Sequence, residues 1–158
     1  DQPQAEGADL QNDGCDAAFV QVDCQAGKIR FAGANIDMIW MPRQGPVQRL
    51  HGDAVGLGYR GTDPGSLSVQ TLTFEAGDRL WLTTDGCVDQ VGRSAPGERL
   101  RAFGYRRLMD VLTQNRSRTL ADNLQILKEH LLAWQGEGLR RDDMTLLALQ
   151  LKRSEVIN

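Results

Sequence analysis

The stretch from residue 78 to residue 92 constrains the fold more than any other part of the chain. An apolar run, Leu80-Trp81-Leu82, stops abruptly there at Thr83-Thr84-Asp85-Gly86. Trp and Thr favour strands, whereas Asp and Gly are depleted in them. We therefore predict a buried strand that delivers Asp85 to its exposed end, where Gly86 lets the chain turn. A carboxylate held there is well placed to bind a hard cation. The alternative is an ordinary Asp-Gly turn, the more frequent interpretation of such a pair taken alone.

A second acidic stretch stands just before another apolar run. Asp142-Asp143 follows Arg140-Arg141, and the apolar residues 146–151 come shortly after it. Two acidic corners on separate strand edges can share one site of oxygen ligands, which Mg²⁺ and Mn²⁺ prefer. The alternative is a charged turn in which Arg141 pairs locally with an aspartate. The sequence thus predicts either a shared cation site or two unrelated turns.

The remaining pattern predicts short strands, then two helices and one last strand, which is typical of α+β layers. Further strands are expected at 17–22, 29–34, 36–41, 47–50, 67–74 and 144–151, with a hairpin turn at 75–78 leading into the strand before Asp85. The first helix is expected over about 99–114, with an apolar face made of Leu100, Phe103, Leu108, Val111 and Leu112. The second is expected over about 120–134, with Thr119 as its N-cap. Its apolar stripe is predicted to face the core, and consists of Leu120, Leu124, Leu127, Leu131 and Trp134.

Composition excludes several classes of function. A net charge of −3 gives no electrostatic reason to expect nucleic acid. The three cysteines form no Cys-x-x-Cys pair, which favours free thiols in a reducing compartment over a disulfide scaffold. No apolar run has the length of a membrane span, so no membrane contact by this segment is expected. We expect a cytoplasmic location, either on its own or as the cytoplasmic domain of a larger membrane-tethered protein.

Taken together, the order and spacing of several segments resemble the metal-dependent PPM (PP2C-type) protein serine/threonine phosphatases, in particular their bacterial SpoIIE- and RsbU-like branch. The similarity covers roughly residues 12–152. The segments that carry it are Asp13-Gly14-Cys15-Asp16-Ala17-Ala18, Phe31-Ala32-Gly33-Ala34-Asn35, Asp53-Ala54-Val55-Gly56-Leu57-Gly58, Gly77-Asp78-Arg79-Leu80, Thr84-Asp85-Gly86, Asp89-Gln90 and Asp142-Asp143-Met144-Thr145.

This resemblance implies an α+β fold, a PP2C-like β-sandwich flanked by helices, with the metals at one end. It implies a dinuclear Mn²⁺ or Mg²⁺ centre that activates a water molecule, with Asp85 and Asp142 as metal ligands and Asp143 supporting the turn. No other catalytic residue is predicted. The implied substrate is a phosphorylated Ser or Thr on a small regulatory protein in bacterial signalling, such as an anti-sigma-factor antagonist.

One departure from the family pattern concerns its first metal motif, an Asp-Gly in a Gly-rich stretch upstream of the segment near Asp13. No such stretch is present, and Asp13-Gly14 sits at the wrong place to replace it. The expected organisation is therefore a loop or frayed terminus at 1–12, the C-terminal part of a phosphatase domain at 13–152 and a tail at 153–158. A sandwich incomplete on its N-terminal side needs a partner, either the missing segment or a second chain. A degenerate phosphatase fold that acts as a non-catalytic protein-binding module is the alternative function.

Overall fold

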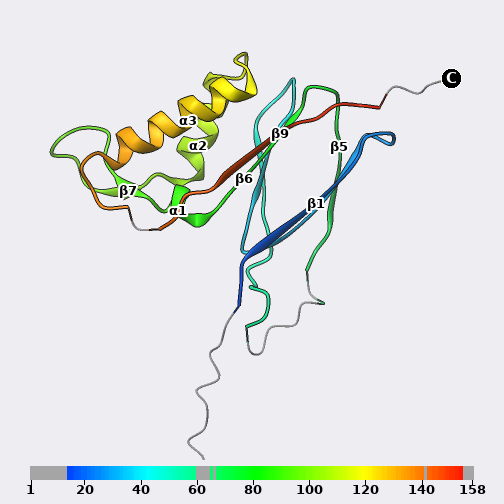
Figure 1. The fold of residues 1–158 in the computed structure, drawn as a ribbon, viewed down its shortest axis with the longest axis horizontal. Coiled ribbons are helices and arrows are strands. Elements are labelled where there is room, and N and C mark those ends of the chain that lie inside the picture. The colour runs from blue at the N-terminus through cyan, green and yellow to red at the C-terminus, as the bar shows by residue number, and fades with distance from the viewer. Residues whose placement is uncertain (1–13, 60–64, 66, 141, 155–158) are drawn as a thin grey trace, which may run out of the picture.

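The computed structural model describes residues 14–59, 65, 67–140 and 142–154, which form an α+β fold of strands and helices in layers (Figure 1). The elements in order are β1 (Ala17–Asp23), β2 (Lys28–Ala34), β3 (Met38–Met41), β4 (Gln48–Leu50), β5 (Gln70–Thr73), β6 (Arg79–Thr83), α1 (Asp85–Val88), β7 (Val91–Gly92), β8 (Arg101–Ala102), α2 (Gly104–Gln114), α3 (Leu120–Gln135) and β9 (Leu146–Gln150). The predicted α+β class is confirmed.

Two antiparallel sheets form the sandwich. One has the order β1-β2-β5 and the other the order β4-β3-β6-β9, while β7 and β8 make a separate ribbon. Successive side chains along the central strands point to opposite faces of the sheet, so they are divided between two cores. Met38 and Leu80 pack between the sheets, against Phe31 of β2. Ile39 and Trp81 point to the opposite face, where the helices lie.

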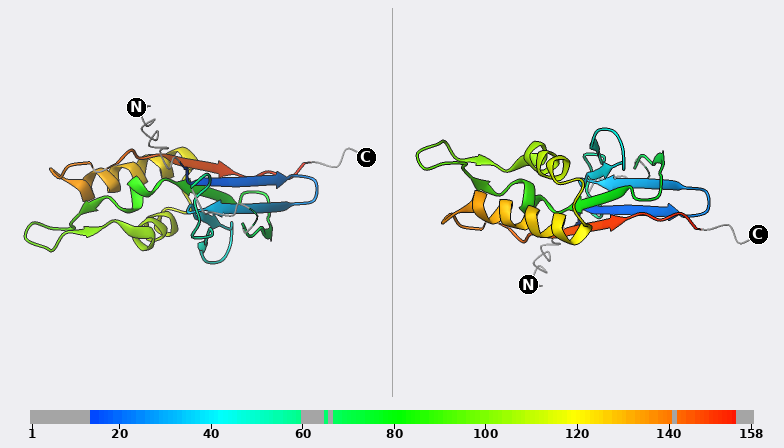
Figure 2. Two further views of the ribbon diagram at one scale, coloured as in Figure 1. Left: turned by 90° about the horizontal axis from the view of Figure 1, so that it is seen from below. Right: turned by 90° about the horizontal axis from the view of Figure 1, so that it is seen from above.

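Helices α2 and α3 pack against each other and cover the outer face of the four-stranded sheet (Figures 1 and 2). The apolar stripe predicted for the second helix does face the core, and Leu127 at its centre is completely buried beside Trp81. Thr119 is the N-cap, because its Oγ1 accepts a hydrogen bond of 3.1 Å from the backbone N–H of Asp122. The prediction for the second helix is therefore confirmed.

The first helix begins later than predicted. Residues 101–102 form β8 and pair with β7, and α2 starts only at Gly104, whose φ of +75° does not fit the interior of a right-handed helix. Leu100 lies outside the helix with 57% of its surface exposed, so its predicted place on the apolar face is wrong. Phe103 is buried, but as the residue that precedes the helix.

The turn at 75–78 does not close a hairpin, contrary to the sequence prediction. It joins β5, which pairs with β2, to β6, which pairs with β3 and β9 in the other sheet. Asp78 holds this corner because its buried carboxylate accepts hydrogen bonds from the backbone N–H groups of Arg43 (2.6 Å) and Glu75 (3.0 Å) and from Nε1 of Trp40 (3.3 Å). A buried carboxylate with these donors links the two sheets where the chain crosses between them.

Strand β9 forms one edge of the four-stranded sheet. Leu147 and Leu149 stand on the face of β9 that also carries Leu80 and Leu82 on β6, yet they are 49% and 40% exposed. Within the described part of the chain, no strand pairs with the free edge of β9. None of the described helices is long and apolar enough to cross a lipid bilayer.

Candidate functional site

Asp85 stands directly after the central strand β6 and opens the short helix α1, with its side chain exposed. Thr84 precedes it as the N-cap residue, but its hydroxyl does not cap the helix. The hydroxyl instead accepts from the backbone N–H of Thr145 (3.0 Å) and donates to the backbone C=O of Asp143 (3.1 Å). The end of β6 is therefore fastened to the segment that leads into β9.

The two acidic corners predicted from the sequence lie against each other. The backbone of Asp142 and Asp143 passes directly over Gly86, so a Cβ at residue 86 would collide with the C=O oxygen of Asp143 and lie 3.3 Å from the carbonyl carbon of Asp142. Asp142 is exposed, and its Oδ1 accepts a hydrogen bond of 2.7 Å from the backbone N–H of Asp143. The structure thus brings together the segments of Asp85 and Asp142, which are far apart in the sequence.

The chemistry of these donors suits a hard divalent cation only in part. Exposed carboxylates at two adjoining backbone corners match the oxygen ligands of Mg²⁺ or Mn²⁺, and Mg²⁺ commonly keeps several of its own waters. Among the described residues, however, no group of three or more His, Cys, Asp or Glu side chains is placed to hold a metal. Exposed carboxylates are suitable ligands for a largely hydrated cation, but the described residues alone do not make the ligand set of a dinuclear centre.

Behind the Asp85 corner the chain is packed and apolar. Cys87 of α1 is buried, with its Sγ 3.7 Å from the backbone oxygen of Thr145, and burial raises the pKa of its thiol. Thr83 is also buried, and its hydroxyl donates to the same oxygen at 3.1 Å. The corner that carries Asp85 therefore rests on a buried, hydrogen-bonded base.

A cavity of about 310 Å³ opens beside Asp85. Its wall is built by side chains from several elements, namely Asn35, Asp37, Arg49, His51, Asp53, Thr83, Asp85, Val88, Asp89 and Tyr105. Sequence reasoning did not place these residues together. Asn35, Asp53, Asp85 and Asp89 stand in segments that resemble the family, and Asp37 is an acidic residue inside the otherwise apolar run 36–41.

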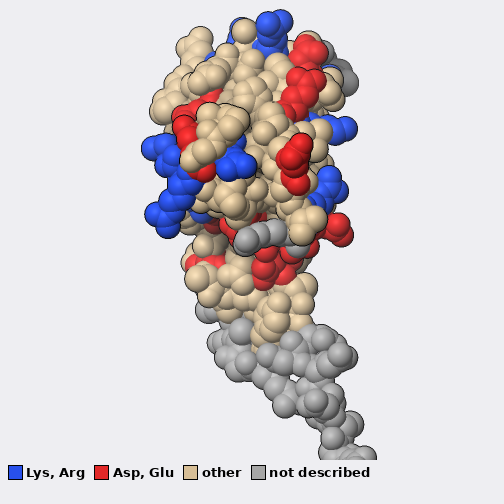
Figure 3. All heavy atoms as spheres, turned by 90° about the vertical axis from the view of Figure 1, so that its left-hand side faces the viewer, with Lys and Arg blue, Asp and Glu red and all other residues tan. Residues whose placement is uncertain are grey.

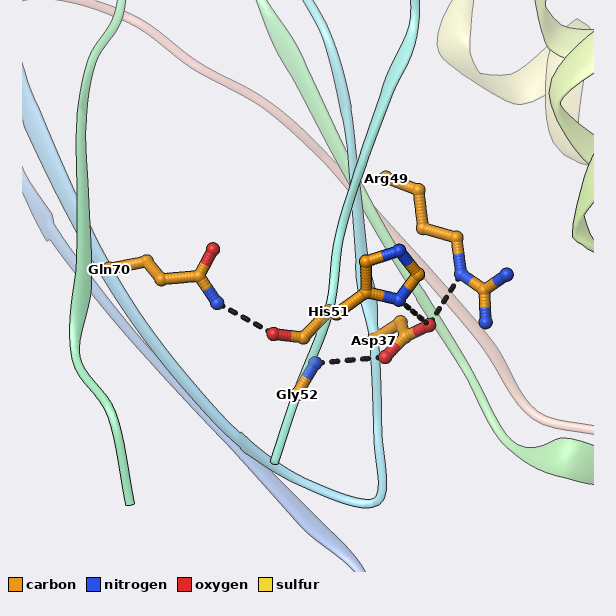
Figure 4. A network of polar contacts seen from close by, with 5 residues as sticks. All are labelled: Asp37, Arg49, His51, Gly52 and Gln70. Carbon is orange, nitrogen blue, oxygen red and sulfur yellow. Dashed lines mark hydrogen bonds and ion pairs between the residues drawn. The ribbon is translucent and has the colours of Figure 1, made fainter. Parts of the chain in front are cut away.

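The centre of that wall is the carboxylate of Asp37 (Figure 4). It pairs with Nε of Arg49, accepts from the backbone N–H of Gly52 at 2.8 Å and lies 3.3 Å from Nδ1 of His51. The guanidinium of Arg49 also stacks on the ring of Tyr105, 3.6 Å from its centroid. Burial first, and the charge of Asp37 second, raise the pKa of the Tyr105 phenol. These contacts join β4 to α2 at the edge of the cavity.

A family model described as stage II sporulation protein E (SpoIIE) matches residues 5–152 of the chain. The chain belongs to the SpoIIE family. Among solved structures, the SiaA-PP2C domain of Pseudomonas aeruginosa is 31% identical, with a TM-score of 0.75 over 87% of this chain and 52% of that one. No curated protein sequence is similar enough to count as a match.

More distant relatives share the fold of this SpoIIE-family chain. The RsbU and RsbW domains of Rv1364c from Mycobacterium tuberculosis are 20% identical, with a TM-score of 0.65 over 88% of this chain and 36% of that one. The manganese-presoaked phosphatase domain of SpoIIE from Bacillus subtilis is 15% identical, with a TM-score of 0.56 over 89% of this chain and 58% of that one. These likenesses confirm the predicted PP2C-type fold. The chain spans roughly half of the SiaA domain and less than two thirds of the other two.

Proposed function

We propose that this SpoIIE-family chain is part of a metal-dependent phosphatase that removes phosphate from Ser or Thr of a small regulatory protein in bacterial signalling, such as an anti-sigma-factor antagonist. The observation that carries the proposal is the contact between the Asp85 and Asp142 corners, made through Gly86 and Thr84. Membership of the SpoIIE family supports the reaction class. The cytoplasmic location stays a prediction.

In this proposal Asp85 and Asp142 hold the cation, and the chain fixes where their charges lie. Thr84 ties the two corners together, while Gly86 lets their backbones touch because it has no Cβ. Bound Mn²⁺ or Mg²⁺ supplies Lewis-acid chemistry by lowering the pKa of a water molecule and neutralising phosphoryl charge. We place the entry of the phosphoryl group in the cavity beside Asp85, and the wall of that cavity includes Asp85 itself. The roles of Asp85 and Asp142, a dinuclear centre and a supporting role for Asp143 stay predictions.

The partners proposed for the chain are inferred from the exposed leucines and unpaired edge of β9 and from the distribution of charge on the surface. The exposed Leu147 and Leu149 beside an unpaired strand edge favour a covering segment, either a further part of the domain (with 13–152 as its C-terminal part) or a second chain. On the face drawn in Figure 3, basic and acidic side chains are interspersed. That face has no continuous basic surface for nucleic acid.

A Mn²⁺ titration of the purified chain, followed by thermal melting, tests the cation site. Asp85→Asn and Asp142→Asn remove the charge and keep the shape of the side chain, so each should abolish the rise in melting temperature that Mn²⁺ gives the wild type. Asp143→Asn is the matched control, and it should lose less of the rise in melting temperature that Mn²⁺ causes. An Asp85→Asn variant that responds to Mn²⁺ like the wild type would refute the role of Asp85.

Turnover separates the enzyme from the alternative, a degenerate fold that acts as a protein-binding module. Because two carboxylates leave a cation mostly hydrated, residues 1–158 should bind Mn²⁺ weakly and hydrolyse little p-nitrophenyl phosphate. In a protein that contains the whole domain, the phosphorylated regulatory protein should be dephosphorylated with Mn²⁺, and both Asp→Asn variants should be inactive. Binding of that phosphoprotein without Mn²⁺-dependent turnover would favour the binding module.

A further inference from the structure

Arg49 is held in one orientation at the edge of the cavity beside Asp85. It lies on β4, and its Nε donates to Oδ2 of Asp37. The Cζ atom of its guanidinium lies over the ring of Tyr105 of α2, 3.6 Å from the ring centroid, and 34% of its side chain remains exposed. Two fixed contacts on different elements restrict the rotamers of a side chain that is otherwise flexible. An arginine fixed in this way loses less conformational entropy when it binds a ligand.

The unused donors of Arg49 are its two terminal amino groups. Within the described part of the chain, neither donates a hydrogen bond. In Figure 4 the dashed contact to Asp37 starts at Nε of Arg49 and not at either terminal nitrogen, and Arg49 and Asp85 line the same cavity. Paired N–H groups of a guanidinium match the oxygens of a phosphoryl group and bind them bidentately. A cavity of about 310 Å³ accommodates such a group together with water.

We infer that Arg49 binds the phosphoryl group of the substrate in this cavity, with Asp37 and Tyr105 as its positioning residues. The inference rests on the proposed phosphatase function, since it places the substrate phosphate beside Asp85. Arg49 then donates hydrogen bonds to the phosphoryl oxygens, and its contacts with Asp37 and Tyr105 fix the direction of those bonds.

The charges around the cavity set a condition on this binding. Four carboxylates, those of Asp37, Asp53, Asp85 and Asp89, line it together with Arg49 and His51. Asp53 is already engaged, since it accepts from the backbone N–H (2.6 Å) and the hydroxyl (3.1 Å) of Ser68. An anion entering this acidic cavity alone is repelled, whereas a divalent cation at Asp85 offsets the repulsion. Phosphate binding should therefore require Mg²⁺ or Mn²⁺ as well as Arg49.

Calorimetric titration of the full chain with inorganic phosphate, with and without excess Mg²⁺, tests the inference. Arg49→Gln removes the charged fork and should raise the Kd for phosphate about tenfold or more, in line with the loss of hydrogen bonds to a charged group. Arg49→Lys keeps the charge without the fork and should restore only part of the affinity. Asp37→Asn releases the guanidinium and should also weaken phosphate binding.

Arg107→Gln is the matched control. Arg107 stacks on Trp134 at 4.1 Å and donates to the backbone oxygens of Ala102 and Phe103, but it does not line the cavity. Its loss should leave phosphate affinity unchanged. Equal phosphate affinity in Arg49→Gln and wild type, or no phosphate binding by the wild type in Mg²⁺, would overturn the inference. A lowered melting temperature with unchanged phosphate affinity would show that Arg49 is only structural. The Mg²⁺ response of Asp85→Asn tests the proposed function separately.

Discussion

Replacing Gly86 by alanine tests the contact on which the candidate site depends. Gly86 lies in α1 and does not have a positive φ, so removing glycine there should by itself stabilise the helix by about 1 kcal/mol. The added Cβ, however, would overlap the backbone oxygen of Asp143 and lie 3.0 Å from its carbonyl carbon. This is backbone, held through Thr84 and Thr145, and it cannot swing aside like a flexible side chain.

Overpacking of this kind costs about 1–3 kcal/mol, and the cost here should lie near the upper limit because the opposing atoms are fixed. After subtracting the gain in helix propensity, Gly86→Ala should destabilise the chain by about 1–2 kcal/mol. That corresponds to a melting temperature about 2–8 °C lower for a chain of this size. Separation of the two corners should also weaken the response of the chain to Mn²⁺.

The assay is thermal melting with and without Mn²⁺, and Gly97→Ala is the control. Gly97 has a φ of +87° but open space around the position of a Cβ, so its substitution strains the backbone without a collision. It should lower the melting temperature and leave the Mn²⁺ response intact. If Gly86→Ala melted at or above the wild-type temperature with an unchanged Mn²⁺ response, the two corners would not be packed as described, and the reasoning would fail.

Two further predictions concern the core and the thiols. Leu127→Ala should lower the free energy of unfolding by about 2–5 kcal/mol because Leu127 is fully buried. Leu132→Ala, on the exposed side of the same helix, should change the free energy of unfolding by less than about 0.5 kcal/mol. Chemical denaturation measures both variants, and equal losses would contradict the orientation of α3. Because burial raises the pKa of Cys87, iodoacetamide at pH 8 should alkylate Cys87 in the native chain at least about tenfold more slowly than the exposed Cys15. Mass spectrometry measures the two alkylation rates. Comparable rates would show that Cys87 is accessible.

The parts that were predictable from the sequence share a physical cause. The strand before Asp85 was predicted from its apolar run and the stripe through Leu127 from its helical periodicity, and both lie in the core around Trp81. The ends of these elements are also signalled locally, by Thr119 at one helix and by the change from apolar to acidic residues at Asp85. The meeting of the Asp85 and Asp142 corners was predicted as one of two alternatives. In the structure it occurs because β6 and β9 are antiparallel neighbours, which places the end of one strand beside the start of the other.

Other features depend on partners far away in the sequence. Asp37 and Arg49 both belong to the β3–β4 region, but the third member of their network, Tyr105, comes from α2. No local pattern ties a tyrosine of one helix to that strand pair, so the cavity wall could not be predicted. The late start of α2 is of the same kind, since β8 exists only through its pairing with β7. The change of sheet after β5 likewise depends on Asp78, whose donors Trp40 and Arg43 lie in another part of the chain.

The two carboxylates of the candidate site are supported unequally. Asp85 follows β6, which is paired on both sides and rests on the core around Trp81, so its corner is rigid. Asp142 precedes β9, which within the described chain is paired on one side only and shows Leu147 and Leu149 to solvent. Structures open most readily where buried contacts are few. We therefore expect a partner that covers β9 to restrain Asp142 more than Asp85.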